Sequence, residues 1–240
     1  MQTNPFSQFS QQAAHGTHFF FALLPDAATR AEIARVGERF RKSHRLIGTP
    51  IDPDDLHLTV CDMGRPQNLR QSLEGALLAA AAEVSVKEFR ITLDSALRLS
   101  ASHDGNFPFV LSADTASVEA ALKLRRALAE AQQRLGLQVG GVSSYLPHVT
   151  LLRGHAVDAV QESIVPVGWD AREFVLIRSF FGQSRHQVMG RWPLQREPAP
   201  ERFDLDDLPD LAELPESPGA SDSLPLFGDD MSAYEPPKDR

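Results

Sequence analysis

The sequence predicts a mixed fold of helices and strands arranged as two related lobes. Two stretches of the chain share one order of strand, capped helix, glycine- or proline-containing loop and strand. Matching residues recur 88 positions apart in the first strand and helix cap, and 91 positions apart in the second strand. They are Phe19, Phe21, Leu23 and Asp26 with Phe107, Phe109, Leu111 and Asp114, and then His57 with His148. Such a repeat indicates a duplicated unit whose equivalent residues face one another.

The first copy is expected to contain three strands and two helices. Asp26 follows Pro25 and is placed to cap a helix whose apolar residues recur at helical spacing. The expected elements are a strand at 17–24, a helix from Asp26 to about His44, a strand at 56–61, a helix at 67–83 and a strand at 86–100.

The second copy repeats this order and is followed by a final pair of strands. Asp114 is the expected helix cap, and Gly136 is placed to end the helix. The expected elements are a strand at 107–113, a helix at 115–135, a strand that contains His148, and a closing strand pair at 171–182 and 186–194.

Both ends of the chain differ in composition from the region between them. Residues 197–240 contain thirteen acidic residues, three basic ones and eight of the 17 prolines. Such a segment buries too little apolar surface to offset its ordering entropy, so we expect it to be disordered. Residues 1–16, rich in Gln, Ser and Asn, are expected to be a second loose end. The folded domain is therefore expected at 17–196, with a net charge of +2 within the chain's total of −8.

Composition also indicates the cellular compartment of the protein. The longest apolar runs are too short to span a bilayer, and the N-terminus lacks the basic start and apolar stretch of a secretory signal. Cys61 is the single cysteine, so no internal disulfide can form. We therefore expect a cytoplasmic protein.

The second strand of each copy carries a histidine and a threonine separated by one apolar residue. The two segments read His57-Leu-Thr59-Val and His148-Val-Thr150-Leu. Because strand side chains alternate, the histidine and threonine of each segment share one face, roughly 7 Å apart. One such pair is commonly structural, but packing gives no reason for the same polar pair to occur twice. The sequence therefore predicts a cleft lined by two imidazoles and two hydroxyls.

This set of side chains suits attack of water on a phosphodiester. A neutral histidine can accept the proton of the water while a protonated histidine donates one to the departing oxygen. Thr59 and Thr150 can donate to phosphate oxygens, and Arg153 is the candidate for an added charged contact. No metal or other cofactor is required by this chemistry. Alternation also places Cys61 on the face of His57 and Thr59. A Cys61–histidine nucleophilic pair is nevertheless a weaker alternative, because residues two apart on one strand seldom align for proton transfer, and a buried inert thiol is the expected state.

The paired motifs, with Pro147 before the second and Arg153 after it, resemble the 2H phosphoesterase superfamily. The resemblance extends over residues 18–194, and the most similar branch is the bacterial 2′-5′ RNA ligase family, also described as RNA 2′,3′-cyclic phosphodiesterases. It implies a bilobal α+β fold with two antiparallel sheets around a central cleft. It also implies His57 as proton donor and His148 as proton acceptor.

The implied activity is the opening of a 2′,3′-cyclic phosphate, at an RNA end or in a small nucleotide, to a 2′-phosphate. Weak 2′-5′ joining of RNA ends without ATP is also implied. A phosphodiesterase for 2′-5′ linked oligonucleotides and a non-catalytic binder of RNA ends or nucleotides remain as alternatives. Many relatives continue the first motif with Phe-Leu-Gly where this chain has Asp62-Met63-Gly64, and a charged Asp62 would disfavour long polyanionic substrates.

One short apolar segment interrupts the acidic tail. Ser223-Leu-Pro-Leu-Phe227 resembles the peptides by which bacterial proteins bind the sliding clamp, although the usual leading Gln is absent. We expect either residual hydrophobicity without a role or a docking peptide for such a partner. The chain contains no glycine-rich phosphate loop and no lysine-centred nucleotidyl-transfer motif, so ATP-driven ligation is not expected.

Overall fold

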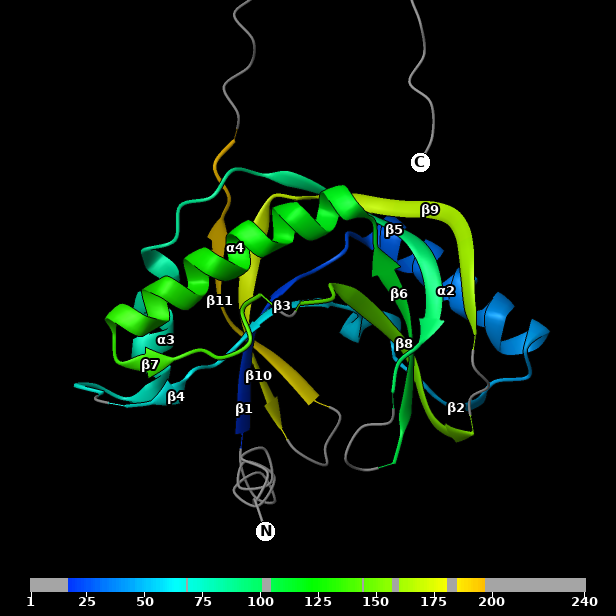
Figure 1. Cartoon of the computed structure of the whole chain (residues 1–240), viewed down its shortest axis with the longest axis horizontal. Helices are drawn as coiled ribbons and strands as arrows, with labels where there is room; N and C mark the ends of the chain where they lie inside the picture. The colour runs from blue at the N-terminus through cyan, green and yellow to red at the C-terminus, as the bar shows by residue number, and fades with distance from the viewer. Residues whose placement is uncertain are drawn as a thin grey trace, which may run out of the picture. The chain divides into compact units, whose positions relative to one another are not determined.

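A computed structural model describes residues 17–67, 69–100, 105–143, 145–156, 160–180 and 185–196 (Figure 1). The expected loose ends at 1–16 and 197–240, and with them the apolar segment from Ser223 to Phe227, lie outside these residues. No helix within the described ranges is long and apolar enough to cross a membrane.

Three α-helices and eleven strands make up the described part of the chain. The helices are α2 (Ala27–Ser43), α3 (Leu73–Ala82) and α4 (Thr115–Arg134), with a 3₁₀ turn, η2, at Pro53–Asp55. The strands are β1 (Thr17–Leu23), β2 (Ile47–Pro50), β3 (Leu58–Asp62), β4 (Arg65–Pro66), β5 (Phe89–Arg98), β6 (Phe107–Ala113), β7 (Leu137–Gln138), β8 (His148–Ala156), β9 (Gln161–Ala171), β10 (Glu173–Phe180) and β11 (Arg185–Pro193).

Nine of these strands form one large antiparallel sheet made of two halves, and β4 and β7 form a separate two-stranded sheet, which confirms the α+β class. The order is β11-β10-β1-β3 in one half and β8-β6-β5-β9 in the other, and β2 also pairs with β8. The halves meet at β3 and β8, where the recorded pair is Leu58 with Val149. Both side chains are fully buried. One backbone pairing therefore joins the two lobes that the repeat predicts.

The helix caps confirm the repeat in detail. Asp26 accepts a hydrogen bond from the Thr29 backbone N–H at 2.8 Å, and Asp114 accepts one from the Ser117 N–H at 2.8 Å. The two aspartates have nearly the same backbone angles, φ −66° and ψ 169° for one and φ −67° and ψ 169° for the other. Each carboxylate satisfies a donor that the first turn of a helix leaves without a partner.

A second shared detail is a bulge at the same place in both lobes. Cys61 pairs with Phe21 and Thr59 with Ala22, which leaves Val60 as the extra residue. Leu152 pairs with Phe109 and Thr150 with Val110, which leaves Leu151 as the extra residue, 91 positions further on. Each bulge interrupts the alternation of side chains, so the residues beyond it change faces.

Each long helix contacts the strand of the other lobe that lies at the junction, β8 for α2 and β3 for α4. Helix α2 contacts β8 and β9, and α4 contacts β3, β5 and α3 (Figure 1). Gly37 of α2 lies against Leu151, where an added Cβ would come within 3.5 Å of that side chain. Gln132 of α4 is fully buried, accepts a hydrogen bond from the Gly64 N–H at 2.7 Å and donates to the Asp62 carbonyl. These contacts cross the junction between the lobes and fix their relative position.

Several element boundaries differ from the sequence predictions. The helix expected at 67–83 begins only at Leu73, because Ser72 caps it by accepting from the Gly75 N–H. The final strand pair begins at Glu173, since Ala171 belongs to β9. Strands β2, β4, β7 and β9 were not predicted. All four residues of β2 are exposed, and β9 contains Pro166 and Gly168, which are uncommon inside strands.

We expect the junction between the lobes to be sensitive to loss of volume. Leu58→Ala would leave a cavity beside Val149 and should lower the free energy of unfolding by about 2–5 kcal/mol, as measured by urea denaturation. Val165→Ala serves as the control, because Val165 is 75% exposed and its truncation should change stability by less than about 0.5 kcal/mol. Equal effects of the two substitutions would contradict a packed junction.

Candidate functional site

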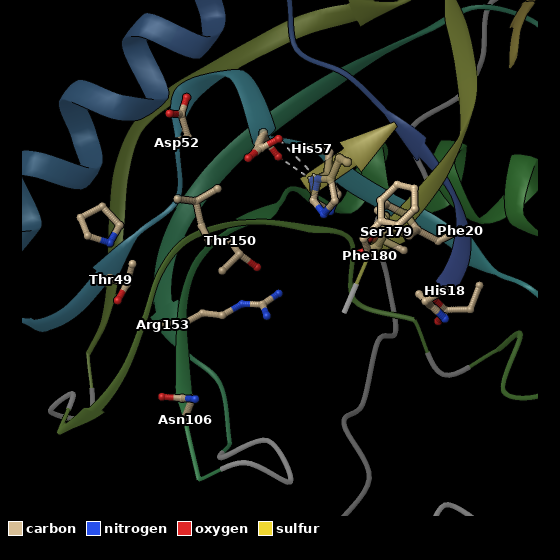
Figure 2. A pocket seen from close by; sticks show the side chains of 16 residues that line it. His18, Phe20, Thr49, Asp52, His57, Asn106, Thr150, Arg153, Ser179 and Phe180 are labelled. Carbon is tan, nitrogen blue, oxygen red and sulfur yellow. Dashed lines mark hydrogen bonds and ion pairs between the residues drawn. The ribbon is translucent and has the colours of Figure 1, made fainter. Parts of the chain in front are cut away.

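A cavity of about 850 Å³ opens beside the junction of β3 and β8 (Figure 2). Four of the five predicted site residues line it, namely His57, Thr59, Thr150 and Arg153. The fifth, His148, lies at the start of β8 and is close enough for its charge to act on His57. The structure thus brings together the two segments that the sequence singled out.

The antiparallel register explains why the two motifs meet. Because Leu58 pairs with Val149, the residue before Leu58 lies across from the residue after Val149. His57 is therefore next to Thr150, and Thr59 is next to His148. The apolar partners Leu58 and Val149 point into the core, so the two histidines and two threonines share the opposite face.

The two imidazoles are held in the same way. His57 Nδ1 lies 2.7 Å from the Asp55 carbonyl oxygen, and His148 Nδ1 lies 2.8 Å from the Leu146 carbonyl oxygen. A carbonyl oxygen only accepts, so Nδ1 of each ring carries the hydrogen. Each ring therefore has Nε2 available to accept a proton when neutral or to donate one when charged.

The bulges determine which charged residues reach the cavity. By simple alternation Arg153 would share the core face of Val149, but the extra residue Leu151 turns Leu152 inward and Arg153 toward the cavity. Figure 2 shows the Arg153 guanidinium directed into the cavity toward His57. At the same position of the first lobe, Asp62 also lines the cavity.

The bulge at Val60 overturns the expected orientation of the Cys61 side chain. Alternation placed the Cys61 thiol on the face of His57 and Thr59, but Val60 is the extra residue and Cys61 points into the core, fully buried. Burial raises the pKa of the Cys61 thiol to about 12. A thiol in this state is protonated at neutral pH, which removes the cysteine nucleophile as an alternative.

Burial also lowers the pKa values of both histidines. Desolvation, followed by the charges of His186, Arg153 and His148, lowers the pKa of His57 to about 4, against the opposing hydrogen bond to Asp55. Desolvation and the charge of Arg153 lower the pKa of His148 as well, against its hydrogen bond to Leu146. Both shifts favour the neutral form of the rings near pH 7.

Sequence reasoning missed two further histidines of the cavity. The sequence did not single out His186 of β11, but its ring centroid lies 5.2 Å from that of His57 and its Nδ1 lies 3.6 Å from an Asp55 carboxylate oxygen. The sequence did not single out His18 of β1 either, but it lies at the cavity beside Asp62 and Phe20. His18 precedes Asn106 by the repeat offset of 88, which was the available signal, and Asn106 also lines the cavity.

Helix α4 and the segment before β8 hold β3 in place from behind. Arg125 is 8% exposed and donates to the Val60 carbonyl at 2.7 Å and to the Gly141 carbonyl at 3.2 Å. The Tyr145 hydroxyl donates to the Thr59 carbonyl at 2.8 Å, and the Arg125 guanidinium lies over the Tyr145 ring. These bonds satisfy backbone carbonyls around the bulge and so position Thr59.

Across the described ranges, no group of three or more His, Cys, Asp or Glu side chains has the arrangement of a metal site.

Comparison with known proteins gives matches only among solved structures. No known family profile and no curated protein sequence matches the chain. LigT of E. coli, in complex with 3′-AMP, is 26% identical with a TM-score of 0.55 over 74% of this chain and 98% of its own. A protein described as a phosphoesterase is 25% identical with a TM-score of 0.53, over 75% and 99%. TT0787 of Thermus thermophilus shares the fold at 20% identity, with a TM-score of 0.56 over 75% and 100%.

The fold and site together define the class of protein. Two related α+β lobes each present one His-x-Thr segment at a shared cavity. Nearly the whole length of LigT and of the matched phosphoesterase aligns with this fold. The chain belongs to the 2H phosphoesterase superfamily.

The electrostatics of the cavity can be tested without any assay of turnover. We expect the His57 imidazole of the unliganded protein to titrate with a pKa of about 4 in an NMR pH series, because its environment favours the neutral ring. Inorganic phosphate should raise this pKa, because a bound anion favours the charged ring. The signal that is missing from the spectrum of His57→Asn identifies the His57 ring. A pKa at or above ~6.5 without phosphate would show that the ring is well hydrated or faces an anion.

Proposed function

We propose that this protein is a phosphodiesterase that hydrolyses 2′,3′-cyclic phosphates, at RNA ends or in small nucleotides, to 2′-phosphates. In the proposed reaction His148 Nε2 accepts a proton from water as the water oxygen attacks phosphorus. The bond from phosphorus to the 3′ oxygen breaks, and His57 Nε2–H donates its proton to that oxygen. Proton exchange with solvent then returns both rings to their starting states.

The observation that carries this proposal is the matched pair of imidazoles. Each Nδ1 is occupied by a backbone carbonyl two residues earlier, so each Nε2 is the nitrogen left for chemistry. A cyclic diester needs one group to accept a proton and another to donate one, on opposite sides of phosphorus. The antiparallel junction of β3 and β8 supports this geometry, because it presents the two rings from different strands.

Three further residues are proposed to bind the phosphate. The Thr59 and Thr150 hydroxyls lie beside the two histidines and can donate to the oxygens that do not react. Arg153 adds a charged donor whose planar fork fits phosphate oxygens. These contacts would strengthen as negative charge develops on the oxygens, which is the condition for a catalytic effect.

The low pKa of His57 is compatible with its proposed role as donor. A low pKa makes the protonated form of His57 rare at neutral pH, but a phosphate anion beside the ring favours that form. Substrate binding and protonation of His57 are therefore coupled. A ring of low pKa is also a strong acid once charged, which assists the departure of an alkoxide.

The solved relatives support a nucleotide or phosphate ligand. LigT of E. coli was crystallised with 3′-AMP and with phosphate. We carry over to this chain only the class of ligand. Ligation of RNA ends through a 2′-5′ linkage, the reverse type of reaction, is proposed as a weak side activity, and a cytoplasmic location is proposed to supply RNA ends.

Replacement of the two histidines tests the proposal. His57→Ala and His148→Ala should each lower kcat toward a 2′,3′-cyclic nucleotide by roughly 10²-fold to 10⁴-fold, because each removes one half of the proton transfer. The double variant should lose far less kcat than the product of the two single losses, because either substitution alone already interrupts the proton transfer. His44→Ala is the control, because His44 caps α2 and pairs with Glu162 outside the cavity. Near-normal turnover in either folded variant would contradict the two-histidine mechanism, whereas a wild-type protein without turnover would be better described as a binding protein.

Chelation tests the absence of a metal from the mechanism. Because two side chains supply both proton transfers, turnover should persist after dialysis against EDTA, as measured with the same cyclic nucleotide. Activity that disappears with EDTA and returns with a divalent cation would contradict the two-histidine mechanism.

A further inference from the structure

The cavity carries opposite charges at two positions that the repeat makes equivalent. Asp62 and Arg153 are 91 residues apart, follow the bulged residues Val60 and Leu151 by the same interval, and both line the cavity. Since β3 and β8 are antiparallel and cross at Leu58 and Val149, the chain runs in opposite directions to these two residues. The framework is therefore symmetric while its charge is not.

The residues around each end extend this difference. Near Asp62, His18 Nε2 lies 3.2 Å from the carboxylate, and the His18 and Phe20 rings stack with centroids 5.9 Å apart. Near Arg153, the repeat counterpart of His18 is Asn106, and Thr49 pairs with Arg153 across β2 and β8. Figure 2 shows His18, Phe20 and Phe180 on one side of the cavity and Thr49, Asn106 and Arg153 on the other.

This distribution orients a bound nucleotide. A phosphate at the histidines is attracted by Arg153 and repelled by Asp62. Asp52 and Asp55 also line the cavity, so Arg153 attracts this one phosphate and no further negative charge is favoured there. The Asp62 end offers aromatic faces and a carboxylate, which suit an uncharged ring with N–H donors. Leu58 and Asp62 lie opposite Leu23 and Phe20 of β1, which are three strand steps or roughly 10 Å apart, enough room for a nucleoside attached to the phosphate.

We propose that Asp62, positioned by His18, binds the base of the nucleotide substrate and selects guanine. This inference rests on the proposed function for the place of the phosphate. His18 donates to one carboxylate oxygen, which leaves the remaining lone pairs of the carboxylate as acceptors. Guanine presents two adjacent donors, N1–H and the N2 amino group, on one edge. Uracil presents a single N–H between two carbonyl oxygens, and these oxygens face a carboxylate unfavourably.

The test is equilibrium binding by calorimetry, which needs no turnover. The ligands are guanosine 2′-monophosphate, uridine 2′-monophosphate and inorganic phosphate, each titrated into the full chain. Asp62→Asn keeps the shape of the side chain and removes its charge. Asp52→Asn is the matched control, because Asp52 also lines the cavity with a carboxylate and asparagine preserves its hydrogen bond from the Asp54 N–H. Melting temperatures confirm that both variants fold.

The two ligand types should respond to Asp62→Asn in opposite directions. The guanosine nucleotide should bind about 10-fold more weakly, because a carboxylate contact to two N–H groups is lost. Inorganic phosphate should bind equally or more tightly, because a repelling charge is gone. The preference for the guanosine over the uridine nucleotide should therefore disappear, and Asp52→Asn should preserve it.

Three outcomes would overturn the inference. These are equal affinity of the wild-type protein for the two nucleotides, a parallel loss of phosphate affinity in Asp62→Asn, and the same loss of guanosine preference in Asp52→Asn. Failure of the wild-type protein to bind phosphate or either nucleotide would overturn both this inference and the proposed function. Guanosine-selective binding that depends on Asp62 in a protein without turnover would support the inference and remove the proposed reaction.

Discussion

The backbone pairing of Leu58 with Val149 is the constraint on which the site depends. It joins the two halves of the sheet, and it sets the register that places His57 beside Thr150 and Thr59 beside His148. A shift of one residue would turn all four polar side chains into the core and the two apolar ones into the cavity. Because Leu58 and Val149 are fully buried, hydrophobic burial enforces the register in which the polar residues meet. The stability of the junction and the geometry of the site therefore have one origin.

The bulges add what an ideal pair of strands could not provide. With strict alternation, a strand that presents a histidine and a threonine to the cavity would bury the residue at the place of Arg153 or Asp62. The extra residue at Val60 or Leu151 changes the alternation, so two consecutive apolar residues face the core and a charged residue follows on the cavity side. Arg125 and Gln132 donate to backbone carbonyls around the first bulge, which offsets the local loss of pairing.

The sequence predicted the repeat, both helix caps and four of the cavity residues because these depend on local patterns. Asp26 and Asp114 act within one turn of helix, and the His-x-Thr segments act within one strand. The predicted orientation of the Cys61 side chain was wrong, because a bulge depends on the pairing of two strands and has no periodic pattern of its own in the sequence. His186 was missed for a related reason: β11 follows the repeat, and only the order β11-β10-β1-β3 brings it to His57.

The difference between the two histidines that the proposed acid–base chemistry requires comes from residues that break the symmetry of the duplicated framework. The repeat places the two imidazoles in matching positions with matching hydrogen bonds, so geometry alone would give them the same protonation behaviour. The surroundings differ, since the His186 ring lies 5.2 Å from that of His57 and its charge further lowers the pKa of His57. His186 belongs to the strand pair outside the repeat, and Asp62 and Arg153 give opposite charges to equivalent positions inside it. Symmetric backbones thus bring two similar groups to one cavity, and residues that break the symmetry give those groups different surroundings.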